Sequence, residues 1–152
     1  MKFLYIIAFL LVTFSGCAQK NAFERFHITQ SQELTEENIQ SLKITNPKMD
    51  VVGVITAVYL NKVKPEVYKK YEYFYIYLYD KKKNEKARFS LNDEPAFISE
   101  EIPARNEFTH LTSFESKWNN YYFVKFKKQK GTLHLKVSLG KNSSTFLFKQ
   151  DQ

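Results

Sequence analysis

Between residues 68 and 80 the chain alternates two kinds of side chain with a period of two. The odd positions carry Tyr71, Tyr73, Tyr75, Tyr77 and Tyr79, and the even positions between them carry Phe74, Ile76 and Leu78. Successive side chains of a β-strand point to opposite faces, whereas a helical face repeats every 3.6 residues. The segment therefore predicts a strand with a tyrosine face and an apolar face.

The same period recurs along most of the chain after residue 50. Residues 51–60 form an apolar run rich in β-branched side chains, which predicts a strand covered on both faces. Further strands are expected at these segments: 87–91, 121–127, 133–139 and 146–148. Short turns join the later ones, at Lys130-Gly131 and at 140–142.

The predicted fold is all-β, a mainly antiparallel sandwich with a small barrel as the alternative. The irregular stretch 92–116 holds Pro95 and Pro103, so we expect a long connection with short edge strands. Such a connection fits a crossover between two sheets better than an up-and-down barrel.

One short N-terminal helix is expected from about Glu36 to Lys43. Thr35 can cap its N-terminus, and Leu34 can pack on Ile39 as a hydrophobic staple. Two turns are too short to be stable alone, so we expect the helix to cover an edge or end of a sheet through Ile39 and Leu42.

The first seventeen residues have the order of an export signal: Lys2, an apolar run over 3–14, then Ser15-Gly16-Cys17. The run is shorter than the roughly 20 apolar residues that a membrane-spanning helix needs. The segment resembles a bacterial lipoprotein signal, although Phe14 stands where such signals most often carry Leu. An ordinary cleaved signal and an uncleaved anchor are the alternatives.

The resemblance implies that residues 1–16 are removed and that Cys17 is lipidated. The expected organisation is then signal 1–16, lipidated cysteine and tether 17–30, and a single β-rich domain over 31–152. Ala18, rather than Asp, follows the cysteine, and by resemblance this favours anchoring to the outer membrane, facing either the periplasm or the cell surface.

No motif for catalysis, a metal or a cofactor is visible. Cys17 is the only cysteine, so its lipidation would leave no thiol for a disulfide, a nucleophile or a metal site. The three histidines, His27, His110 and His134, are isolated, and no serine lies in a Gly-x-Ser-x-Gly motif. We expect a protein that is not an enzyme and that has no cofactor.

Two aromatic features are candidate binding surfaces. The five tyrosines at spacing two cover roughly 27 Å of strand, enough for a platform that stacks on sugar rings or a peptide. The preferred interpretation is that neighbouring segments cover this row by half. Trp118, with Asn119 beside it, is typical of a glycan contact, but a lone Trp entering a strand is more often a core residue.

Positive charge is the third candidate feature. The chain carries 23 Lys and Arg against 16 Asp and Glu, and residues 117–149 hold eight lysines and no carboxylate. Lys125 and Lys127 are expected on solvated strand faces that discourage aggregation, with an anionic membrane or an acidic protein as the alternative role. Lysines outnumber arginines 20 to 3, and no nucleic-acid-binding motif is visible, so nucleic acid is not an expected partner.

These features predict a membrane-anchored envelope lipoprotein that acts as a binding or accessory module for an envelope protein. A glycan-binding lipoprotein and an envelope inhibitor of the immunity type are the alternatives.

Overall fold

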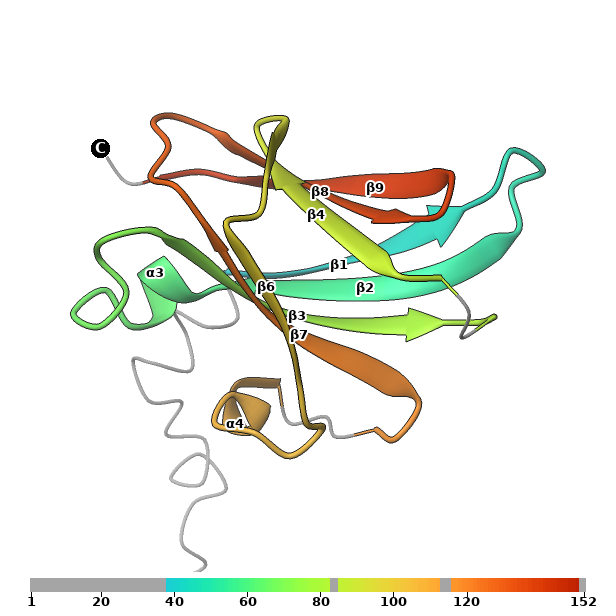
Figure 1. Cartoon of the computed structure of the whole chain (residues 1–152), viewed down its shortest axis with the longest axis horizontal. Coiled ribbons are helices and arrows are strands. Elements are labelled where there is room, and N and C mark those ends of the chain that lie inside the picture. The colour runs from blue at the N-terminus through green and yellow to red at the C-terminus, as the bar shows by residue number, and fades with distance from the viewer. Residues whose placement is uncertain (1–37, 83–84, 113–115, 151–152) are drawn as a thin grey trace, which may run out of the picture.

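The computed structural model describes residues 38–82, 85–112 and 116–150, and these form two antiparallel sheets that lie one above the other (Figure 1). The larger sheet has the order β1-β2-β3-β7-β6, with bounds Ile39–Thr45, Val51–Tyr59, Glu72–Asp80, Asn119–Phe126 and Ile98–Ile102. The smaller sheet has the order β5-β4-β8-β9, with bounds Glu94–Pro95, Ala87–Leu91, Leu133–Leu139 and Asn142–Phe148. The predicted all-β, antiparallel, sandwich-like class is confirmed, and the barrel alternative is wrong because the sheets do not close on each other.

The main core lies between the two sheets, as the alternation predicts. Phe74, Ile76 and Leu78 of β3 point into it and are buried. The smaller sheet supplies the opposing layer: Phe89, Leu91, Leu133, Leu135, Val137, Leu139, Phe146 and Phe148. Removing this apolar surface from water is the main term that stabilises the fold.

The chain crosses between the sheets in the stretch that was expected to be a long connection. Asn92 and Asp93 both have positive φ (49° and 66°), as a two-residue hairpin turn requires, and they bring β5 back along β4. The N–H of Ala96 then donates to the carbonyl of Phe89 (3.1 Å), and the next N–H, that of Phe97, donates to the carbonyl of Lys125 in the other sheet (2.8 Å). Short edge strands and a crossover are both confirmed.

The helix expected over 36–43 is wrong where the structure describes it. Residues 39–43 lie in β1, which pairs with β2 from Ile39 opposite Val58 to Thr45 opposite Val51. Without β1, one edge of β2 would leave its backbone N–H and C=O groups unpaired. As part of a strand, Leu42 and Ile44 also both reach the main core. Residues 34–37 lie outside the described part of the chain.

The outer face of the larger sheet has a second, smaller core. The segment before and including α4 (Thr109–Thr112) runs beneath this face in Figure 1. Its Phe108 stacks on Phe123 (ring centroids 5.7 Å apart, 5° between planes) and packs on Tyr75 (5.1 Å). The middle of the outer face is therefore covered.

The predicted anchor at Cys17, the signal 1–16 and the tether 17–30 lie outside the described residues. Within the part that is described, neither α3 (Leu60–Val63) nor α4 is long and apolar enough to cross a membrane.

Candidate ligand pocket on the larger sheet

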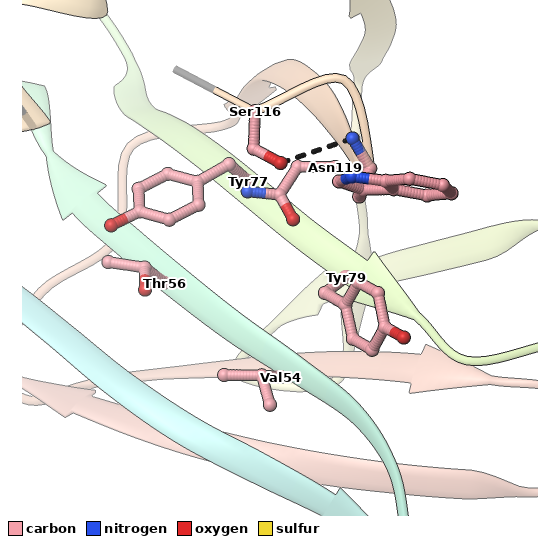
Figure 2. A pocket seen from close by; sticks show the side chains of 7 residues that line it. Val54, Thr56, Tyr77, Tyr79, Ser116 and Asn119 are labelled. Atoms are coloured by element: carbon pink, nitrogen blue, oxygen red, sulfur yellow. Dashed lines mark hydrogen bonds between the residues drawn. The ribbon is translucent and has the colours of Figure 1, made fainter. Parts of the chain in front are cut away.

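An open pocket of about 550 Å³ lies on the outer face of the larger sheet, toward the end where β1 turns into β2. Three segments line it. Strand β2 contributes Val54 and Thr56, β3 contributes Tyr77 and Tyr79, and the entry to β7 contributes Ser116, Trp118 and Asn119. Figure 2 shows the β2 side chains facing Ser116 and Asn119, with the two tyrosines between them.

The strand register brings these residues together from distant parts of the sequence. Val54 pairs with Tyr79, which pairs with Asn119 on its other side. Two residues further along β2, Thr56 pairs with Tyr77 of β3. Because the intervening residues point into the main core, all of these side chains share the outer face.

A buried tyrosine fixes the segment that carries Trp118. The hydroxyl of Tyr121 accepts from the N–H of Ser116 (2.8 Å) and donates to the carbonyl of the same residue (3.0 Å). The hydroxyl of Ser116 accepts from the N–H of Trp118 (3.2 Å), and the Asn119 N–H donates to the Ser116 carbonyl (3.3 Å). These bonds hold one wall of the pocket against the sheet.

Trp118 was expected in the core, and this is wrong: 65% of the residue is exposed. It precedes the first residue of β7, so it is not bound by the alternation of that strand. Tyr121 and Tyr122, one on each face of β7, are the buried aromatic residues of this strand that lie nearest to Trp118 in sequence.

The chemistry of the pocket is aromatic, polar and neutral. None of its seven lining side chains is charged at neutral pH. The amide of Asn119 offers both donors and an acceptor, and the hydroxyl of Thr56 is hydrogen-bonded to that of Ser41 (2.7 Å). The arrangement suits an uncharged ligand with apolar faces and hydroxyl groups.

The predicted tyrosine row is not one surface. Tyr75 is buried under Phe108, whereas Tyr77 and Tyr79 on one side of it line the pocket. On the other side, Tyr71 and Tyr73 are half-buried in a separate cluster. An unbroken exposed platform of five tyrosines is therefore excluded, and the half-covered arrangement is what the structure shows.

That separate cluster holds a lysine. The ammonium of Lys125 lies 3.9 Å from the ring centroid of Tyr71 and 5.7 Å from that of Phe97, which stacks on Tyr71. Lys125 is thus half-buried in a cation–π contact rather than on a solvated face. Lys127, just beyond the end of β7, is exposed as expected.

A second, more polar pocket of about 480 Å³ lies near Glu85, Glu101 and Tyr122. Burial raises the pKa of Tyr122 above its ordinary value, and the nearby Glu101 and Asp80 raise it further.

His134 is exposed on β8, and no three His, Cys, Asp or Glu side chains among the described residues form a metal-binding group.

Sequence reasoning identified Tyr77, Tyr79, Trp118 and Asn119 but missed Val54, Thr56 and Ser116. The pairing of β3 with β2 on one side and with β7 on the other brings these residues to the pocket, and no local pattern in the sequence shows that pairing. Comparison with known proteins adds no further assignment: no protein-family model, no curated protein and no solved structure matches this chain.

Proposed function

We propose that this protein is a lipid-anchored binding module of a bacterial envelope and that its ligand is a neutral carbohydrate. One observation carries the ligand class: Tyr77, Tyr79 and Trp118 converge with the Asn119 amide around one open, uncharged pocket. The anchor is proposed from the resemblance of residues 1–17 to a lipoprotein signal.

A sugar ring matches this pocket chemically. Its C–H faces are apolar and stack on aromatic rings, while its rim of hydroxyls needs donors and acceptors, which Asn119 and the pocket hydroxyls offer. The volume lies within the range of about 300–1,000 Å³ that is usual for ligand sites. Because the pocket is open, it can accept one residue of a longer chain.

A protein partner is the second candidate, as first predicted for an accessory module. The observation in its favour is that the apolar side chains of Val54, Tyr79 and Trp118 are exposed next to one another. Aromatic residues of this kind dominate the binding energy of many protein interfaces. The envelope-inhibitor alternative stays a prediction, which the identity of neighbouring genes would test.

A glycan screen with matched variants tests the proposal. We expect the purified chain to bind a neutral glycan, and Trp118→Ala to weaken that binding by about tenfold or more, which corresponds to about 1.4 kcal/mol. Tyr71→Ala is the matched control, because it removes a partly exposed aromatic ring of the same row outside the pocket. No binding across the screen, or equal loss in both variants, would refute the carbohydrate assignment.

The protein-partner candidate and the anchor need their own measurements. Capture from native membranes of one stoichiometric protein that Trp118→Ala releases would favour the accessory module. Mass spectrometry of the N-terminus tests the anchor. We expect a lipid-modified Cys17 without residues 1–16, and a free thiol at Cys17 would refute the proposed lipid anchor.

A further inference from the structure

We infer that the end of the sandwich opposite the pocket is a membrane-facing surface that contacts anionic lipid headgroups. This inference rests on the lipid anchor of the proposed function, but not on the ligand in the pocket. The described chain begins at this end, where the carbonyl of Asn38 accepts from the N–H of Tyr59 (3.2 Å), next to α3.

The topology gathers lysines at the same end. Tyr59 pairs with Phe74, Glu72 with Phe126, and Leu133 with Phe148, so the segments beyond these pairs lie together. Figure 1 shows α3, the β7–β8 turn and the C-terminal end on this side of the molecule. These segments carry eight lysines: Lys62, Lys64, Lys69, Lys70, Lys127, Lys128, Lys130 and Lys149. We name this set the lysine end.

Among the residues that the structure describes, the acidic side chains at or beside the lysine end are fewer than the lysines. They are Glu66, Glu72, Asp93, Glu94 and Glu107. Glu72 is 0% exposed and lies 3.2 Å from the ammonium of Lys128, so it adds no negative surface. Seven of the eight lysines are exposed and Lys62 is half-buried, which leaves the surface positive.

Two apolar side chains protrude beside these lysines. Val67 is 61% exposed in the loop after α3, and Phe97 is 58% exposed where it stacks on Tyr71. A positive surface with protruding apolar groups is the combination that binds in the interface of an anionic bilayer. Dispersed lysines act as separate point charges, which suits attraction to many headgroups. A single site that recognises its ligand by bidentate hydrogen bonds would favour arginine instead.

Charge, and not the tether, would set the orientation. The 20 residues between Cys17 and Asn38 can reach up to about 70 Å, so they would allow any face of the domain to meet the bilayer. The lysine end would hold one orientation. Tyr79 lies seven residues along β3 from Glu72, about 23 Å at 3.3 Å per residue, so the pocket would be displaced away from the lipid.

Single-cysteine labelling of the lipidated chain tests this orientation, because Cys17 is its only native cysteine and carries the lipid. The chain is placed in vesicles of phosphatidylcholine alone or mixed with phosphatidylglycerol. A fluorophore is attached at Val67→Cys, or at Lys141→Cys in the β8–β9 turn at the other end, and a headgroup-bound quencher reports proximity. We expect severalfold stronger quenching at 67 than at 141 on anionic vesicles, and a smaller difference on neutral vesicles and at high salt.

Charge reversal provides the matched control. The triple variant Lys64→Glu, Lys69→Glu and Lys130→Glu should abolish the difference between the labels. A control triple variant, Lys43→Glu, Lys48→Glu and Lys81→Glu, changes the net charge by the same amount but lies toward the other end of the domain. It should leave the difference between the labels intact. Equal quenching of the two labels on anionic vesicles, or loss of the difference in both variants, would overturn the inference. Glycan binding and the mass of the N-terminus are measured separately, so a failure of the proposed function would be seen independently.

Discussion

Replacing Glu72 with Gln should destabilise the protein, although the two side chains have nearly the same shape. Glu72 is a buried carboxylate that accepts from three donors besides the ammonium of Lys128. Its Oε2 accepts from the hydroxyl of Tyr59 (2.6 Å), and its Oε1 accepts from the Gln150 amide (2.9 Å) and the Gln129 N–H (3.3 Å). A glutamine has one acceptor oxygen where the carboxylate has two, so at least one buried donor loses its partner.

The expected loss can be worked out from these contacts. Hydrogen bonds to charged groups contribute about 1.5–3 kcal/mol each, and a buried donor left without a partner costs about 1–3 kcal/mol. The Lys128 ammonium is on a side chain that is 52% exposed, so solvent screens it and its share is below about 1 kcal/mol. We therefore expect Glu72→Gln to lower the free energy of unfolding by about 2–4 kcal/mol.

Urea unfolding followed by circular dichroism measures this loss. Tyr59→Phe removes only the shortest of the four contacts and should cost about 1–2 kcal/mol, whereas Lys128→Gln should cost less than about 1 kcal/mol. The reasoning is refuted if Glu72→Gln stays within about 0.5 kcal/mol of the parent chain, or if Lys128→Gln costs as much.

Three further predictions concern single contacts. In Gly53→Ala the new Cβ would lie 2.9 Å from Leu139 Cδ1 and 3.0 Å from the carbonyl oxygen of Tyr79, so we expect a loss of about 1–3 kcal/mol in urea unfolding, and no loss would contradict it. Asn61→Ala removes bonds to the Tyr68 and Tyr71 carbonyls and the Tyr73 N–H, so amide exchange at residues 68–73 should accelerate relative to β8. Because the pKa of Tyr122 is raised above 10.0, the folded state holds its phenolic proton longer than the unfolded state, and stability should fall as pH rises above that value. The fall should be shallower in Tyr122→Phe, and equal slopes would argue against a raised pKa.

The strands could be predicted because their signal is local. In β8 and β9 the side chains that alternate in sequence also alternate between core and surface, and in β3 they alternate between the main core and the outer face of the sheet. The same reasoning failed at β1, where Thr35 and the apolar pair Leu34 and Ile39 indicate the start of a helix. Pairing with β2, fifteen residues away at Ser41 and Thr56, decides the structure of this segment instead.

The candidate pocket could be predicted only in part. The alternation places Tyr77 and Tyr79 on one face, and the Trp118-Asn119 pair suggests a polar aromatic contact. The neighbours Val54 and Thr56 depend on the order of three strands, which no short segment encodes. The exposure of Trp118 depends on hydrogen bonds that a buried tyrosine makes to a loop.

The tyrosine row shows why a pattern alone does not define a binding site. The alternation places five tyrosines on one face of the strand. The segment that packs over the middle of that face leaves them in three different environments. Phe108 buries Tyr75 in the middle, leaving an uncharged pocket at Tyr77 and Tyr79 and a cation–π cluster at Tyr71 and Tyr73. The covered middle separates a neutral surface from a positive one on the same sheet. Two surfaces of such different chemistry suit two different contacts, a neutral ligand at one end and an anionic bilayer at the other.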